Sequence, residues 1–210
     1  MNFLAHLFLA EPTPASMLGN LLADFVKGKA HLEYPTDVQN GIAQHRRVDA
    51  FTDAHLLVHR SIGRISGRWG WFAGVIIDVV YDHYLARNWH TYTDTPLRQF
   101  TRQAYATLGP QEPLMPEPMR YLVRRMIAED RLMAYCHLDA VEQTLARISW
   151  RLRQRFQKRE IRLEQALADL REHQDGLEAD FREFFPELMQ ECAGQSSGRQ
   201  PDVTLVCSSD

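Results

Sequence analysis

The stretch WGWFAGVIIDVVYDHYLARNW, residues 69–89, decides the fold, because its apolar residues recur on almost every side of a helix. A helix that is apolar all round is buried at the centre of a helical protein. Two carboxylates, Asp78 and Asp82, interrupt this surface four residues apart, and His83 follows the second. A buried carboxylate needs a cation, an arginine or a metal ion, and the adjacent histidine favours the metal. The sequence therefore predicts a central helix that carries metal ligands.

The stretch QHRRVDAFTD, residues 44–53, places three ligand-type side chains four residues apart: His45, Asp49 and Asp53. In a helix each four-residue step turns the side chain by only about 40°, so all three point into one sector. Two such helices that face each other would form a metal site. The two acids also lie at the border of the apolar stripe, where ion pairs within the helix would explain them equally well.

Two guanidinium groups, Arg46 and Arg47, stand beside the same histidine. An arginine can bind a phosphate through two parallel hydrogen bonds, which lysine does not reproduce. Neighbours on a helix diverge by about 100°, so only one of the two arginines is expected to face a bound phosphate. The other would pair with acids of its own helix.

Three further polar residues lie in apolar surroundings near the start of the chain. Asp24 interrupts LLADFV, residues 21–26, and Asn20 precedes it by four residues. Asp24 is either a local cap or ion-pair partner, or a metal ligand. His6 lies in the apolar opening segment, where a hydrogen-bonded core histidine explains it as well as a ligand does.

Caps and apolar periodicity predict an all-α chain, with residues 2–9 as the one segment that could alternate as a strand. There is no glycine-rich phosphate loop and no Gly-x-Ser-x-Gly motif. Pro186 is expected to bend or shorten the last helix. The sequence predicts a single domain over residues 1–192, followed by a flexible polar tail over residues 193–210. The expected helices span residues 16–27, 36–61, 69–89, 96–108, 119–128, 138–156 and 160–189.

Composition narrows the partners and the compartment. The 210 residues are 45% hydrophobic and 24% charged, and the net charge of -3 gives no overall attraction to nucleic acid. Three scattered cysteines suggest neither a disulfide framework nor a zinc knuckle and fit a reducing cytoplasm. No window is long and apolar enough for a membrane span. Arginines cluster within residues 60–68, 120–131 and 147–162, which offers local basic surfaces to an acidic partner.

Aspartates and imidazoles without thiolates suit a catalytic Mn²⁺, Mg²⁺, Fe²⁺ or Zn²⁺ better than a closed structural site. Hydrolysis of a phosphoester is the reaction that such a mixed site performs best. The metal lowers the pKa of bound water from 15.7 to about 7 and offsets charge on the phosphoryl oxygens.

Four blocks occur in order along the chain: MNFLAHL at 1–7, GNLLADFVKG at 19–28, HRRVDAFTD at 45–53 and DVVYDHYLARNW at 78–89. Together they resemble the acyl carrier protein phosphodiesterase family, from residue 1 to about residue 190. The resemblance implies an all-helical enzyme related to the HD-type phosphohydrolases, with a divalent metal that is typically Mn²⁺. It also implies release of 4′-phosphopantetheine from a serine of holo-acyl carrier protein. The chain has no contiguous His-Asp pair, and its DH pair has the reverse order.

The resemblance also assigns roles to residues of the matching blocks. The implied metal ligands are Asp24, His45, Asp78, Asp82 and His83. The residues expected to take part in the chemistry are Asp24, His45, Asp82 and His83, the last as the acid that protonates the leaving serine oxygen. Four further residues, His6, Asn20, Asp49 and Asp53, are expected either to bind the metal or to orient its ligands. Arg46 or Arg47 is expected to contact the phosphate.

Two other functions stay open on the sequence. A metal phosphohydrolase acting on a nucleotide or alarmone would use the same acids, histidines and arginines. A non-catalytic helical module would use the basic clusters alone, to bind an acidic partner. Acyl carrier proteins are acidic helical bundles. If the protein is an acyl carrier protein phosphodiesterase, the arginine clusters are therefore natural docking surfaces for its substrate.

Overall fold

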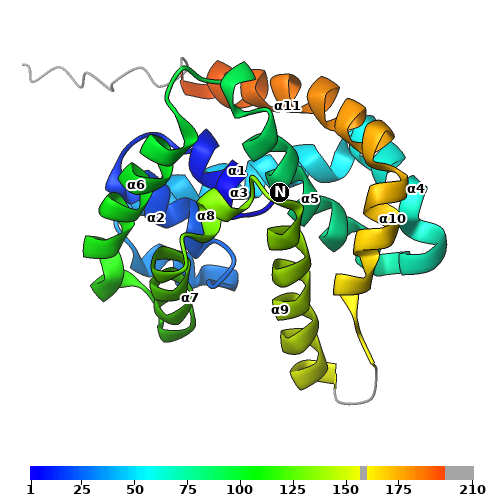
Figure 1. Cartoon of the computed structure of the whole chain (residues 1–210). Coiled ribbons are helices and arrows are strands. Elements are labelled where there is room, and N and C mark those ends of the chain that lie inside the picture. The colour runs from blue at the N-terminus through cyan, green and yellow to red at the C-terminus, as the bar shows by residue number, and fades with distance from the viewer. Residues whose placement is uncertain (157–159, 197–210) are drawn as a thin grey trace, which may run out of the picture.

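The computed structural model describes residues 1–156 and 160–196, and this part of the chain consists of helices and their connections, without a β-strand (Figure 1). The all-α prediction is confirmed. Short 3₁₀ turns join several helices, among them η1 (Gly28–Glu33), η2 (Gly70–Phe72) and η4 (Gly109–Leu114). The α-helices in chain order are α1 (Phe3–Leu9), α2 (Pro14–Leu22), α3 (Thr36–Ala54), α4 (Leu56–Trp69), α5 (Ala73–Arg87), α6 (Leu97–Leu108), α7 (Glu117–Ala128), α8 (Arg131–Ala134), α9 (Leu138–Phe156), α10 (Leu167–Glu172) and α11 (Gln174–Ser196).

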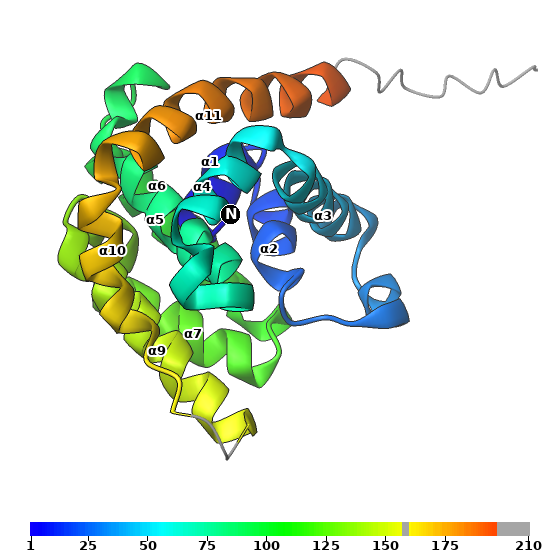
Figure 2. The same ribbon diagram turned by 90° about the vertical axis from the view of Figure 1, so that its right-hand side faces the viewer.

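Helix α5 lies in the middle of the molecule and packs against α1, α4, α9 and α11 (Figures 1 and 2). Its side chains are buried on nearly every side, as the sequence predicts, and Tyr81 and Tyr84 are its largest fully buried side chains. The regular helix begins at Ala73 rather than at residue 69, because η2 precedes it. The expectation that both carboxylates of this helix are buried holds for Asp82 but is wrong for Asp78, whose side chain is 39% exposed.

Helices α2 and α3 approach each other backbone to backbone through two glycines. A Cβ on Gly41 would lie 2.7 Å from the carbonyl oxygen of Ser16, and a Cβ on Gly19 would lie 2.8 Å from the Cα of Gly41. Only glycine leaves room for this contact. Because His45 follows Gly41 by one helical turn, the same contact determines where His45 lies.

A buried carboxylate joins α4 to α11. Asp180 is fully buried and accepts hydrogen bonds from Arg60 Nε at 2.7 Å, from the Ser61 hydroxyl at 2.9 Å and from Arg64 Nε at 3.1 Å. Two guanidinium groups and a hydroxyl therefore compensate for the loss of water around this charge.

Several helix boundaries differ from the sequence prediction. The helix expected over 36–61 is two helices, because the backbone of His55 is extended and its Nδ1 accepts from the Leu57 N–H at the start of α4. The helix expected over 16–27 begins and ends earlier, because the Thr13 side chain caps α2 at Pro14 and the helix ends at Leu22. The segment expected over 160–189 is likewise η5 (Leu163–Ala166), α10 and α11 in succession.

The opening and closing segments also differ from expectation. Residues 2–9 are not a strand, because they form α1, whose first turn is capped by the buried carboxylate of Asp82. Pro186 does not shorten the last helix, since α11 continues to Ser196. The tail predicted to be flexible, residues 193–210, lies outside the described residues except for 193–196, which belong to α11. Among the helices described, none is long and apolar enough to cross a bilayer.

Candidate metal centre

Two buried histidines from different helices form the middle of the candidate site. His6 belongs to α1 and His45 to α3, and their side chains are 1% and 3% exposed. The two rings stack with their centroids 3.8 Å apart and their planes 16° from parallel. α1 packs against α2, which in turn packs against α3, and this brings together two imidazoles that are 39 positions apart in the sequence.

One carboxylate bridges both rings. Asp49 follows His45 by one turn of α3, and its Oδ2 lies 3.0 Å from His45 Nε2. Its Oδ1 lies 3.2 Å from His6 Nε2. Ligand atoms of these three residues all lie within 4.8 Å of one another, the spacing of a group that could hold a metal ion.

A second carboxylate stands at the edge of this group, which we call the His6–His45–Asp49 cluster. Asp24 follows the end of α2, and its Oδ1 lies 3.5 Å from His45 Nε2. Its side chain is half exposed, whereas the imidazole is buried. Asp24 therefore lies between the buried cluster and solvent.

The amino group of Met1 contributes a positive charge that the sequence analysis missed. It lies 3.1 Å from Asp78 Oδ1 and 3.7 Å from Asp49 Oδ1, and the Met1 carbonyl lies 3.2 Å from His6 Nε2. Burial alone would lower the pKa of this amine, but the carboxylates of Asp78 and Asp49 outweigh it and raise the pKa to about 10. The only sequence feature that could have indicated a role for this amine is that Met1 directly precedes the apolar segment that holds His6.

The two stacked histidines differ in protonation. Burial lowers the pKa of His6, and its hydrogen bond to Asp49 offsets this only in part. Burial acts in the same direction on His45, but the carboxylates of Asp24 and Asp49 raise its pKa to about 9. Burial would raise the pKa of Asp49, yet the two histidines hold it well below its usual range. At neutral pH the cluster therefore carries one imidazolium, at His45, and an ionised Asp49.

A divalent metal fits this donor set. The cluster combines two imidazoles with carboxylate and has no thiolate, which suits Mn²⁺, Fe²⁺ or Zn²⁺ more than the oxygen-preferring Ca²⁺. The Nδ1 atoms of His6 and His45 are buried without a hydrogen-bond partner among the described residues. Neither ring is therefore held by a backbone carbonyl at its Nδ1.

Two of the predicted ligands lie elsewhere on α5. Asp82 Oδ2 and Oδ1 accept hydrogen bonds from the backbone amides of Leu4 at 2.8 Å and Ala5 at 3.1 Å. Burial raises the pKa of Asp82 to about 7, and these two amides act against the shift. His83 Nδ1 lies 2.7 Å from the carbonyl oxygen of Tyr135. The structure thus places Asp82 as the cap of the helix that carries His6 and directs His83 toward the segment after α8.

Two of the other predicted site residues, Asp53 and Asn20, lie in different surroundings. Asp53 is exposed; partial burial and then the neighbouring carboxylates of Asp78 and Asp49 raise its pKa. Asn20 is buried, and its Nδ2 donates to the Ser16 carbonyl oxygen at 3.0 Å and to Gln44 Oε1 at 3.2 Å. Asn20 therefore joins α2 to α3, and among the described residues it forms no hydrogen bond with the cluster.

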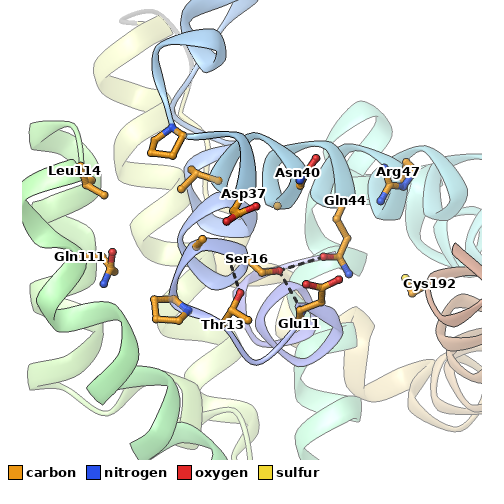
Figure 3. Close-up of a pocket in the computed structure, with 15 residues that line it drawn as sticks. Glu11, Thr13, Ser16, Asp37, Asn40, Gln44, Arg47, Gln111, Leu114 and Cys192 are labelled. Atoms are coloured by element: carbon orange, nitrogen blue, oxygen red, sulfur yellow. Dashed lines mark hydrogen bonds between the residues drawn. The ribbon is translucent and has the colours of Figure 1, made fainter. Parts of the chain in front are cut away.

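The two arginines of α3 diverge as predicted. Arg46 is exposed and lies about 100° around the helix from His45. Arg47 lines a different cavity, of about 700 Å³, together with Ser16, Gln44 and Cys192 (Figure 3). In that cavity the Ser16 hydroxyl lies between Gln44 and the backbone of Glu11, so its walls are joined by neutral hydrogen bonds (Figure 3).

Comparisons with known proteins give one consistent result. A sequence model of the family described as acyl carrier protein phosphodiesterase matches residues 1–188. A protein of that name from Serratia proteamaculans is 37% identical over 192 residues, which cover 91% of this chain and 97% of the relative. A namesake from Yersinia enterocolitica is 35% identical over the same length and coverage, and one from Escherichia coli O6:H1 is 34% identical over 194 residues, 92% and 98% of the two chains. No solved structure matches the chain, so the relation to HD-type phosphohydrolases stays a prediction.

Proposed function

The chain belongs to the acyl carrier protein phosphodiesterase family, and on that premise we propose that it hydrolyses the phosphodiester between 4′-phosphopantetheine and a serine of holo-acyl carrier protein. The products are the apo carrier and free 4′-phosphopantetheine. The observation that carries the proposal is the His6–His45–Asp49 cluster, a donor set for a divalent metal inside a chain of this family.

The proposed metal site consists of the cluster with Asp24 at its edge. Mn²⁺ is our first choice, with Fe²⁺, Zn²⁺ and Mg²⁺ as alternatives, because the donors are two imidazoles and carboxylates. When bound, such an ion lowers the pKa of a water molecule and offsets negative charge on the phosphoryl oxygens. Asp78 forms an ion pair with the Met1 amine at 3.1 Å. In this proposal the ion pair keeps the amine close to Asp49.

We assign the proton transfer to Asp24. Its carboxylate lies 3.5 Å from His45 Nε2 and is half exposed, so it can meet a substrate that arrives from solvent. In this assignment Asp24 accepts a proton from the attacking water and delivers it to the serine Oγ that leaves. The earlier candidate, His83, is engaged with the Tyr135 carbonyl and is not required.

We assign phosphate contact to Arg46 rather than Arg47. Both guanidinium groups are exposed and without an ion pair among the described residues, but Arg46 lies on the flank of α3 nearer to Asp49 and His45. Arg47 lines the cavity of Figure 3, on the other side of the helix. A free guanidinium beside the cluster would bind the phosphoryl oxygens through two hydrogen bonds.

We propose that the protein acts in the cytoplasm, and its free cysteines support this. Cys136 and Cys192 are free in the described structure. Free thiols are maintained in a reducing environment, which supports the cytoplasm as the place of the reaction. The partners proposed are the carrier protein alone, with neither nucleic acid nor membrane.

The test is a conversion measured by intact mass. The metal-loaded protein is incubated with holo-acyl carrier protein, and in parallel with a panel of nucleoside triphosphates and guanosine alarmones. We expect the carrier to lose the mass of 4′-phosphopantetheine and the nucleotides to remain unchanged. Unchanged carrier together with nucleotide turnover would establish the nucleotide or alarmone hydrolase instead. No turnover of either, with carrier binding retained, would establish the non-catalytic module.

A further inference from the structure

A large, mostly apolar groove is lined by side chains of α7, the α8 segment and α9, together with Phe3 and Phe25. Figure 1 shows where these helices lie in the molecule. The volume of the groove is about 890 Å³, and its floor includes Leu122 and Met126 from α7 and Leu132 and Tyr135 from the α8 segment. The mechanism proposed above uses none of these side chains. An apolar groove of this size on a helical protein is a candidate binding surface.

Two large aromatic side chains flank the groove in exposed positions. Tyr121 of α7 is 68% exposed and Trp150 of α9 is 59% exposed. Exposed aromatic residues on facing helices leave apolar area in water that a partner would cover. Tyr, Trp and Arg are the residue types that carry most binding energy at protein interfaces.

The rim of the groove has an excess of positive charge. Three arginines, Arg125, Arg131 and Arg147, converge on the single carboxylate of Glu129. Arg131 Nε lies 2.8 Å and Arg147 Nη2 lies 3.3 Å from Glu129 Oε2. Glu117 is a second carboxylate on the groove wall, but Arg151 and Arg153 of α9 line the groove as well, so guanidinium groups outnumber carboxylates there. The rim therefore attracts an acidic partner.

The groove is lined in part by sequence neighbours of the site residues. Phe3 and Phe25 line it, and Phe25 directly follows Asp24, the residue at the edge of the cluster. Asn2 Nδ2 donates to the Tyr135 hydroxyl on the groove floor at 2.8 Å, one residue from the amine of Met1. A partner seated in the groove would thus have its contact surface beside the proposed catalytic site.

We propose that this groove is the docking surface for the acyl carrier protein, with carboxylates of an acidic carrier helix on the arginine rim and an apolar carrier side chain between Tyr121 and Trp150. The proposal rests on the proposed function, since that function supplies an acidic helical partner. Charge complementarity selects the occupant, because a second copy of this chain would bring its own arginines against the same rim.

The test measures binding separately from turnover. The probe is apo-acyl carrier protein, which lacks the phosphopantetheine arm, titrated into wild type and into the double variant Trp150→Ala/Arg151→Glu. Both residues are exposed, so the variant keeps the core intact. The matched control is Trp71→Ala/Arg171→Glu, which removes an exposed tryptophan and reverses an exposed arginine outside the groove.

We expect the groove variant to raise the Kd for the carrier at least about tenfold and the KM for the holo carrier in parallel, with kcat nearly unchanged. The control should bind as wild type does. Equal binding by groove variant and wild type, while wild type still converts the holo carrier, would overturn the docking site and leave the proposed function standing. Equal weakening by the control, or a wild-type dimer that the groove variant dissociates, would also overturn it. A wild type that binds the carrier but never converts it would instead reject the function.

Discussion

His45 is the residue on which the candidate site depends most. It stacks on His6, bonds to Asp49 and lies beside Asp24, so every other member of the site contacts it directly. The sequence could predict its importance, because the spacing of His45 and Asp49 places both on one face of a helix. It could not predict the partner ring, because which residue of the opening segment meets α3 depends on how the helices pack.

The pH dependence of metal affinity follows from this environment. His45 has a pKa raised to about 9, so at pH 7 the metal-free protein holds a proton that a metal must displace. We expect the affinity for Mn²⁺ to rise by up to about tenfold per pH unit between pH 7 and 9 and to level off above pH 9. Isothermal titration calorimetry in buffers of different ionisation heats would count the protons released. An affinity that does not change between pH 7 and 9 would contradict the assignment of His45 as a ligand.

The α2–α3 contact is the element that holds the site in place. Gly41→Ala would push a methyl group against the backbone of Ser16, because its Cβ would lie 2.7 Å from that carbonyl oxygen. We expect a loss of about 1–3 kcal/mol in the free energy of unfolding, measured with urea, and weaker metal binding. The matched control is Gly63→Ala, at an exposed position of α4 where an added Cβ would meet no atom within 4 Å.

That control should stabilise the protein by about 0.5–1 kcal/mol, because alanine is the better helix former. If Gly41→Ala were as stable as the control and bound metal normally, the close approach of the two helices would not matter for the site.

The α4–α11 pair gives a second element-scale prediction. Asp180→Asn removes the charge that Arg60, Ser61 and Arg64 surround, and we expect a loss of about 2–4 kcal/mol at pH 7. Glu183→Gln, at an exposed acid 3.8 Å from Arg60, is the control and should change stability by less than about 0.5 kcal/mol.

The effect of Asp180→Asn should also depend on pH. Burial would raise the pKa of Asp180, but Arg64, Arg60 and Ser61 together hold it below its ordinary value. A carboxyl group with a lowered pKa in the folded state stabilises the protein above the unfolded pKa of about 3.9 and loses that contribution as pH falls through the folded pKa. The difference between wild type and variant should therefore shrink below about pH 4. A constant difference down to pH 2 would contradict the ion-pair origin.

Over the whole molecule, periodicity was enough to predict the all-α class and the buried central helix α5, because apolar spacing reports burial directly. It did not predict which carboxylates of α5 serve the site. Asp82 is buried and caps the first turn of α1, whereas the partly exposed Asp78 pairs with the Met1 amine, and neither contact can be read from the spacing of ligand-type residues. Contacts between distant segments decide these roles, so a single sequence contains little signal for them.

The central claim is that the His6–His45–Asp49 cluster holds the metal that lets this protein convert holo carrier to apo carrier. The most direct measurement titrates Mn²⁺ into chelator-treated protein and records, in the same samples, bound metal by elemental analysis and apo-acyl carrier protein by mass. Wild type and His31→Ala, the control at a half-buried histidine outside the site whose Nδ1 lies 2.8 Å from the Gly28 carbonyl oxygen, should gain metal and activity together. His45→Ala should stay folded and gain neither. Full metal binding and full conversion by His45→Ala would contradict the account.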